Sequence, residues 1–179
     1  MKRLTLVNPS KKFNTGIIPL GLASISAYLK TYAKDIEIIF LDANCQDIYM
    51  DFVPTDIVAV TSVTQTIGDA IEFAKYVKTF GNIPLILGGV HISTYRILPE
   101  PFDIGVIGEG EQTMLELIQA RSLSKDCTGE IKGICCNVHG KTVFTGSRPL
   151  IEDLDTIPIP DREMANMKHY LRRIRSQHP

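Results

Sequence analysis

The feature that most constrains the fold is a regular alternation, from residue 3 to residue 121, of short apolar runs with longer stretches of helical periodicity. Runs rich in β-branched residues, typical of strands, occur at 3–8, 37–42, 57–63, 84–87 and 103–107. Apolar residues recur at helical spacing in 19–32, 67–77 and 111–121, whereas 40–54 shows no clear helix. Strands that alternate with helices in this way predict a parallel, doubly wound sheet of the α/β class.

The chain after residue 125 has a different pattern. Residues 131–138 and 141–144 flank His139 and Gly140, which predicts a β-hairpin with a tight turn. Prolines spaced among acidic residues indicate a linker at 148–162, and the basic stretch 164–175 could form a helix without an obvious apolar core. We therefore expect an α/β domain at 1–125, a hairpin extension at 126–147, and a linker and tail at 148–179.

Charge and hydropathy argue against several classes of partner. The chain has 19 basic and 20 acidic residues and a formal net charge of −1, so no nucleic-acid partner is indicated. No run approaches the ~18 consecutive apolar residues of a membrane span, and the first residues lack the apolar stretch of a secretory signal. These observations predict a cytoplasmic protein without a membrane span.

The four cysteines carry no metal or disulfide signature. No two of them have CxxC spacing, and the adjacent Cys135 and Cys136 would point to opposite faces of a strand. We expect buried or idle thiols, and therefore no metal ligand among them.

Ligands of doubly wound sheets bind at the carboxyl ends of the strands, and the loop after the third strand is rich in hydroxyl groups. Ser62, Val63 and Thr64 begin this loop, and short hydroxyl side chains can bind a polar ligand or the backbone. Capping of the next helix by Thr64 or Thr66 would explain one of these residues without any ligand, so both interpretations stay open.

The loop after the fourth strand is Gly88-Gly89-Val90-His91. Paired glycines allow a ligand or another backbone to approach closely, because no Cβ is present. The alternative is a strained turn that binds nothing. A histidine beside a turn is more often a hydrogen-bonded structural residue than a metal ligand.

The loop after the fifth strand, Gly108-Glu109-Gly110-Glu111, opens a helix. The helix dipole favours acidic residues in a first turn, which explains Glu111 and less completely Glu109. Glycines on both sides of Glu109 indicate backbone packed against a ligand or a neighbouring loop.

No catalytic triad, Walker loop or dinucleotide-binding GxGxxG motif is present, so no catalytic residue is assigned. One alternative stays open, in which His91 and Glu109 form the acid–base pair of a small free-standing enzyme.

In this order and spacing, the loops resemble the N-terminal B12-binding domain of cobalamin-dependent radical-SAM enzymes. The resemblance covers residues 3–170 and is carried by a series of short loop motifs: Asn8-Pro9, Pro19-Leu20-Gly21-Leu22, Asp42-Ala43, Thr61-Ser62-Val63-Thr64, Gly88-Gly89-Val90-His91, Gly108-Glu109-Gly110-Glu111 and Pro158-Ile159-Pro160-Asp161-Arg162.

The resemblance implies a flavodoxin-like (Rossmann-like) five-stranded sheet of order 2-1-3-4-5 with the hairpin added, and cobalamin as cofactor. The corrin would lie over the strand ends and the nucleotide tail would enter between the loops. The implied cofactor-binding residues are Gly21, Ser62, Val63, Thr64, Gly88, Gly89, Val90, His91, Gly108, Glu109 and Gly110. A degenerate module of the same fold, used for structure or partner binding without a corrinoid, is the alternative.

Two departures narrow this expectation. The loop at 9–18 contains no histidine, so it cannot supply the lower cobalt ligand found in methionine-synthase-like relatives. The chain also lacks the CxxxCxxC motif that holds the 4Fe-4S cluster of radical-SAM enzymes. The cluster, SAM and the methyl transfer typical of the family would then belong to a radical-SAM domain, in cis in a longer enzyme or in a partner in trans.

Overall fold

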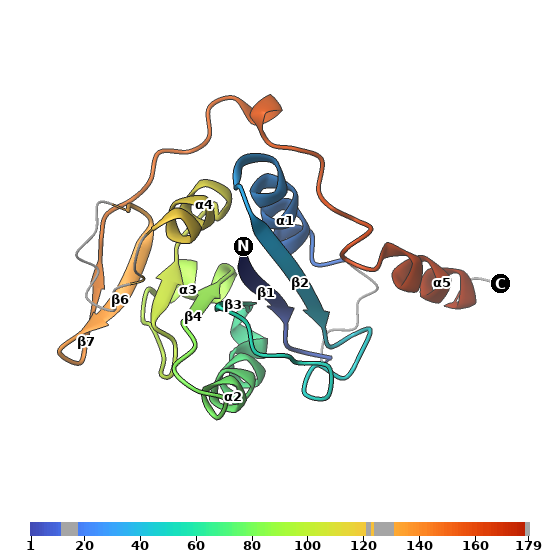
Figure 1. Cartoon of the computed structure of the whole chain (residues 1–179), viewed down its shortest axis with the longest axis horizontal. Coiled ribbons are helices and arrows are strands. Elements are labelled where there is room, and N and C mark those ends of the chain that lie inside the picture. Colours follow the sequence, from blue (N-terminus) through green and yellow to red (C-terminus); the bar gives the residue numbers. More distant parts are fainter. Residues whose placement is uncertain (12–17, 121–122, 124–130, 178–179) are drawn as a thin grey trace.

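The computed structural model describes residues 1–11, 18–120, 123 and 131–177, and it contains one twisted sheet with helices on both faces (Figure 1). The sheet order is β2-β1-β3-β4-β5-β6-β7. The strands are β1 (Lys2–Asn8), β2 (Ile36–Asp42), β3 (Ile57–Thr61), β4 (Leu85–Gly88), β5 (Ile104–Val106), β6 (Ile134–Val138) and β7 (Lys141–Phe144). The first five strands are parallel, which confirms the predicted doubly wound order 2-1-3-4-5.

The predicted hairpin is part of the same sheet. β6 pairs antiparallel with β5, and β7 pairs antiparallel with β6, so the sheet has seven strands rather than five plus a separate extension. Gly105 on β5 permits this packing, since a Cβ there would lie 2.5 Å from the sulfur of Cys135 and 2.9 Å from Ile92.

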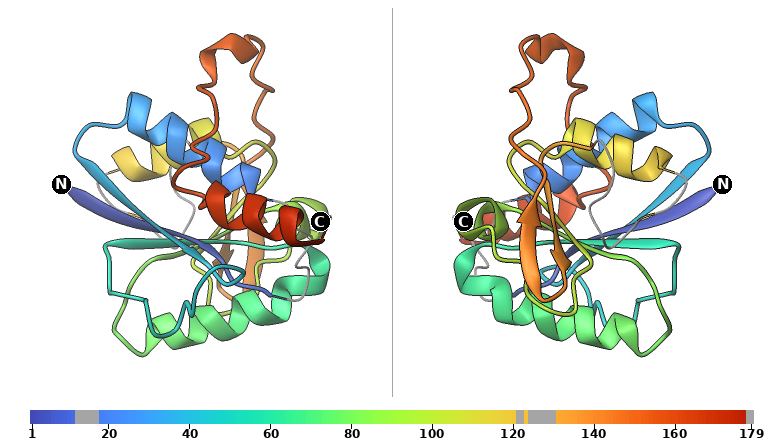
Figure 2. Two further views of the ribbon diagram at one scale, coloured as in Figure 1. Left: turned by 90° about the vertical axis from the view of Figure 1, so that its right-hand side faces the viewer. Right: turned by 90° about the vertical axis from the view of Figure 1, so that its left-hand side faces the viewer.

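Helices cover the two faces of the sheet as two layers (Figure 2). The helices are α1 (Leu20–Tyr32), α2 (Ile67–Lys78), α3 (Val90–Tyr95), α4 (Glu111–Gln119) and α5 (Met167–Gln177), with short 3₁₀ turns η1 (Thr64–Thr66) and η2 (Leu154–Thr156). Alternate strand residues supply the two cores, because successive side chains of a strand point to opposite faces. Leu6 packs in the core with α1 and α4, whereas Val7 packs in the core with α2.

Two elements differ from the sequence-based expectation. β3 ends at Thr61 instead of residue 63, because the chain turns directly into η1. The segment after Gly89 forms the short helix α3, which was not predicted because its six residues show little apolar periodicity. The segment 40–54 contains the end of β2 and no helix, as predicted.

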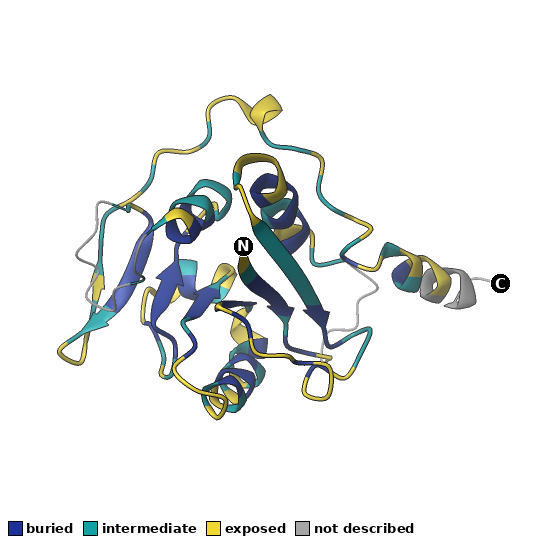
Figure 3. Ribbon diagram, in the orientation of Figure 1, coloured by how far each residue is buried: buried dark blue, intermediate teal, exposed yellow. Residues whose placement is uncertain are grey.

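The linker is mostly exposed in Figure 3, but two residues of the tail are buried. Ala165 and Tyr170 are buried, with relative exposures of 0% and 2%. Asp161 forms an ion pair with Lys30 on α1. The expectation of a tail without a core is therefore wrong for these residues, because the tail makes long-range contacts such as that of the Tyr170 hydroxyl with Asp42, 128 positions earlier. Within the described ranges, no helix is long and apolar enough to span a membrane.

Candidate cofactor cleft at the carboxyl edge of the sheet

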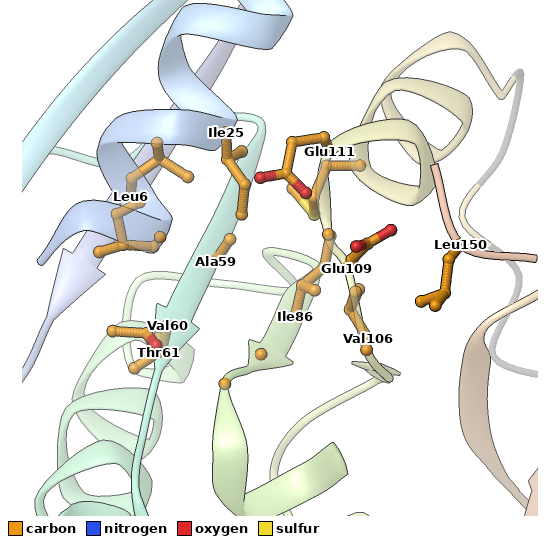
Figure 4. Close-up of a pocket in the computed structure, with 17 residues that line it drawn as sticks. Leu6, Ile25, Ala59, Val60, Thr61, Ile86, Val106, Glu109, Glu111 and Leu150 are labelled. Carbon is orange, nitrogen blue, oxygen red and sulfur yellow. The ribbon is translucent and has the colours of Figure 1, made fainter. Parts of the chain in front are cut away.

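A cavity of about 430 Å³ lies at the carboxyl ends of the central strands, between the sheet and helices α1 and α4 (Figure 4). Its floor consists of Leu6, Ala59, Ile86 and Val106, one residue from each of β1, β3, β4 and β5. The remaining lining residues come from helices, loops and the last residues of β3 and β4: Gly21, Leu22, Ile25, Val60, Thr61, Gly88, Gly89, Gly108, Glu109, Gly110, Glu111, Met114 and Leu150. Most of this lining is apolar, as is usual for a small-molecule or cofactor site.

The cavity brings together about half of the residues predicted from the sequence. Six of them line it: Gly21, Gly88, Gly89, Gly108, Glu109 and Gly110. The other five lie in the turn after β3, including the start of η1, and in the first two residues of α3, and they do not line it: Ser62, Val63, Thr64, Val90 and His91.

The glycines of the cavity have two different roles. A Cβ at Gly21 or Gly88 would meet no atom of the described chain within 4 Å, so these glycines are not required by packing within the protein, whereas Gly108 has a φ of 78° that itself favours glycine. Gly89 has a φ of 96°, and a Cβ there would lie 2.5 Å from the carbonyl oxygen of Ser62. Gly89 is therefore needed for the turn, whereas Gly88 leaves open space at the cavity.

Few polar groups accompany this apolar lining. The hydroxyl of Ser62 is buried and has no hydrogen-bond partner among the described residues. Glu111 Oε1 accepts a hydrogen bond from Ser24 Oγ at 2.7 Å, and Glu109 Oε2 accepts one from the backbone N–H of Ile151 at 3.0 Å. Glu109 and Glu111 line the cavity and each already accepts a hydrogen bond within the protein, whereas Ser62 does not line it.

The turn after β3 is stabilised by Thr66. The N–H of Val63 donates to Thr66 Oγ1 at 3.1 Å, and this hydroxyl donates to the carbonyl oxygen of Val63 at 3.2 Å. The side chain of Thr66 thus closes the turn and does not cap α2. Thr64 is exposed, with its hydroxyl 3.4 Å from Nδ1 of His91.

His91 and Glu109 do not share the cavity. The ring of His91 lies against Tyr95, with 5.0 Å between ring centroids, and His91 is not among the residues that line the cavity. Glu109 lines it and is bonded to the backbone of Ile151. The structure therefore does not assemble the acid–base pair considered above.

The cysteines correct one sequence-based expectation. Cys45 and Cys135 are free thiols, and burial raises the pKa of Cys45 to about 12 and that of Cys135 to about 11. Cys136 is disulfide-bonded, contrary to the prediction of idle thiols, because a disulfide depends on separation in space rather than on spacing in sequence. No group of three potential metal ligands occurs in the part of the chain that the structure describes.

Sequence reasoning missed the floor of the cavity and Leu150. The alternation of side chains along β1 and β3 could have identified Leu6 and Ala59, since both lie near the ends of strands and on one face. Nothing in the sequence around Leu150 indicates its position, because residues 145–153 form no regular element.

The B12 binding domain family matches residues 11–118 of this chain. The match covers more than half of the chain, which therefore belongs to the B12-binding domain family.

Two curated relatives match most of this chain. The chain is 32% identical to an uncharacterized methyltransferase of Pyrococcus horikoshii over 95% of its length, and 34% identical to the anaerobic magnesium-protoporphyrin IX monomethyl ester cyclase of Rubrivivax gelatinosus over 86%. It spans only 40% and 30% of these relatives.

Two structures of the radical S-adenosylmethionine methyltransferase TsrM of Kitasatospora setae share the fold. One, with tryptophan and a SAM analogue bound, has a TM-score of 0.65 and 24% identity, and covers 82% of this chain and 30% of that one. The other, with cobalamin and a [4Fe-4S] cluster bound, has a TM-score of 0.63 and 22% identity, and covers 88% of this chain and 31% of that one.

Proposed function

We propose that this chain binds cobalamin and that the cavity between the sheet, α1 and α4 holds the nucleotide tail of the cofactor. One observation carries the proposal: Gly88 borders the cavity at the end of β4, yet a Cβ there would touch nothing in the described protein. Glycine at such a position is explained by a ligand that needs the space. Membership of the B12-binding domain family indicates which ligand that is.

The chemistry of the cleft fits this tail. The apolar floor of the cavity suits a flat aromatic ring; it consists of Leu6, Ala59, Ile86 and Val106. Gly21 and Gly88 have no side chain and therefore leave room for such a ring beside this floor. Ser62 does not line this cavity, so its buried hydroxyl does not contact a tail held there.

The corrin would then lie over the loops at the same edge of the sheet. Val63 and Val90 are partly exposed in these loops, at 39% and 62%, and offer apolar contacts to a large ring. Thr64 and His91 stand beside them and are joined by the 3.4 Å contact. In this arrangement the chain binds and orients the cofactor, and bound cobalamin supplies the methyl-transfer chemistry.

We further propose that the whole protein is a B12-dependent radical-SAM enzyme. The likeness of this chain to part of two longer relatives, one of them described as a methyltransferase, supports a further domain beyond the cobalamin domain. That domain, in cis or in a partner in trans, would hold SAM and the 4Fe-4S cluster, because the chain contains no CxxxCxxC motif.

Titration with hydroxocobalamin, followed by gel filtration and a visible spectrum, tests the proposal. The wild-type chain should co-elute with close to one corrinoid per chain, with a shifted spectrum. Gly88→Val should lose about tenfold or more in affinity because its side chain enters the cavity.

Gly68→Ala is the matched control, because Gly68 lies on α2 away from the cavity and its Cβ would also meet no atom. It should bind like the wild type. If the wild type elutes without corrinoid at high micromolar concentration, the chain is instead a corrinoid-free structural or partner-binding module.

A further inference from the structure

The cavity contains one residue from outside the matched family domain. Leu150 lies in the segment after β7 and beyond residue 118, where the family match ends, yet it lines the cavity together with Glu109. Figure 4 shows Leu150 past Glu109, on the opposite side of the cavity from Leu6. The linker thus contributes to the wall of the candidate cofactor site.

Two sets of contacts hold this part of the linker at the cavity. The N–H of Ile151 donates to Glu109 Oε2 at 3.0 Å. The guanidinium of Arg148 forms an ion pair with Glu116 on α4, and its Nη1 donates to Gln112 Oε1 at 3.4 Å. Residues 148–151 are therefore attached on both sides of Leu150, to α4 and to the loop that precedes it.

Leu150 itself is 75% exposed, although its neighbours are tethered. Because most of its apolar surface stays in water, this side chain adds little hydrophobic stabilisation to the folded protein at that position. A ligand in the cavity would remove part of its surface from water, which stabilises the bound state.

We propose that residues 148–151 form a strap over the cavity, and that Leu150 contacts the nucleotide tail of bound cobalamin and contributes to affinity for it. This inference rests on the proposed function. It extends the cofactor site from the B12-binding domain into the linker that leads to helix α5.

Leu150→Ala tests the strap, and Leu154→Ala is its matched control. Leu154 is in the same linker and is similarly exposed, at 65%, but it does not line the cavity. Leu150→Ala should weaken hydroxocobalamin binding about fivefold to tenfold in calorimetric titration, and Leu154→Ala should leave it unchanged. Both leucines are exposed, so circular dichroism and thermal melting should show both variants folded.

Dicyanocobinamide, a corrinoid without the nucleotide tail, separates a tail contact from a corrin contact. Neither substitution should change its affinity. Hydrogen exchange should also show the Ile151 amide more protected with hydroxocobalamin than without it.

Three results would contradict the strap, the contact with the nucleotide tail, or cobalamin binding itself. Equal affinities of Leu150→Ala and Leu154→Ala for hydroxocobalamin would exclude the strap while leaving cobalamin binding intact. Weaker binding of cobinamide to Leu150→Ala would exclude the contact with the tail. A wild-type chain that binds no hydroxocobalamin would overturn the proposed function, and the strap with it.

Discussion

The hydroxyl of Tyr170 on α5 donates a hydrogen bond to Oδ2 of Asp42 at the end of β2. Both residues are buried, and they are 128 positions apart in the sequence. Oδ1 of the same carboxylate accepts from Asn8 Nδ2 at 2.9 Å and from the N–H of Asn44 at 3.0 Å. Asp42 therefore joins the ends of β1 and β2 to the tail of the chain.

Removal of the Tyr170 hydroxyl should destabilise the protein. Tyr170→Phe keeps the buried ring but leaves Asp42 Oδ2 with the weaker Cys45 thiol at 3.7 Å as donor, so the free energy of unfolding should fall by about 1–3 kcal/mol. Denaturant unfolding monitored by circular dichroism measures this loss. Tyr95→Phe is the control, since Tyr95 is 53% exposed and its change should be close to zero. Equal stabilities of the two variants would contradict the prediction.

Stability should depend on the protonation of Asp161. Burial alone acts to raise the pKa of its carboxyl, but hydrogen bonds from Lys30, the Met164 N–H and Ser26 outweigh burial, and the pKa lies below its ordinary value of 3.8. A lowered pKa in the folded state gives stability that is present above pH 3.8 and is lost as the pH falls through the folded value.

Asp161→Asn should therefore lower the free energy of unfolding by about 1 kcal/mol at neutral pH and flatten its decline below about pH 4. Urea unfolding at a series of pH values from neutral to acid measures both effects. The exposed Asp155 provides the control variant Asp155→Asn, which should keep the wild-type pH profile. An unchanged acid limb in Asp161→Asn would show that this carboxyl is not responsible.

The thiol of Cys45 should react slowly with alkylating reagents. Burial, followed by the nearby Asp42 carboxylate, raises the pKa of Cys45 to about 12, so very little thiolate is present near pH 7.5. Alkylation by iodoacetamide should be about a thousandfold slower in the folded chain than in the denatured chain, where an ordinary thiol has a pKa of about 8.5. Peptide mass spectrometry over a time course measures both rates, and similar rates would disprove the burial argument.

Substitution by alanine should destabilise the protein at Gly89 but have little effect at the adjacent Gly88, which ends β4. Gly89→Ala should destabilise the chain by about 1–3 kcal/mol, because the residue has a φ of 96° and the new Cβ would lie 2.5 Å from the Ser62 carbonyl oxygen. Gly88→Ala should change the free energy of unfolding by less than about 0.5 kcal/mol, since its Cβ meets no described atom. Thermal and denaturant unfolding of the pair, without cofactor, distinguishes the two roles. A larger loss in Gly88→Ala would refute this assignment.

Local pattern predicted most of the fold. Short β-branched runs and helical periodicity located the five parallel strands and helices α1, α2 and α4, because these elements bury one face or both and their spacing is visible in the sequence. The resemblance supplied the strand order. The sequence pattern did not predict α3, which is too short to show periodicity. It also did not predict that the hairpin pairs with β5, because this pairing joins distant segments.

Some features of the candidate site are likewise visible in the sequence, and others depend on tertiary contacts. Glycine-rich and hydroxyl-rich loops that follow the strands are visible in the sequence, and a parallel sheet places such loops at one edge. Only the tertiary structure separated Gly88, which leaves space, from Gly89, which forms the turn. It alone placed Leu150 at the cavity and Tyr170 on Asp42, because both positions result from contacts between segments that are far apart in the chain. Such contacts leave no periodic signal along the sequence.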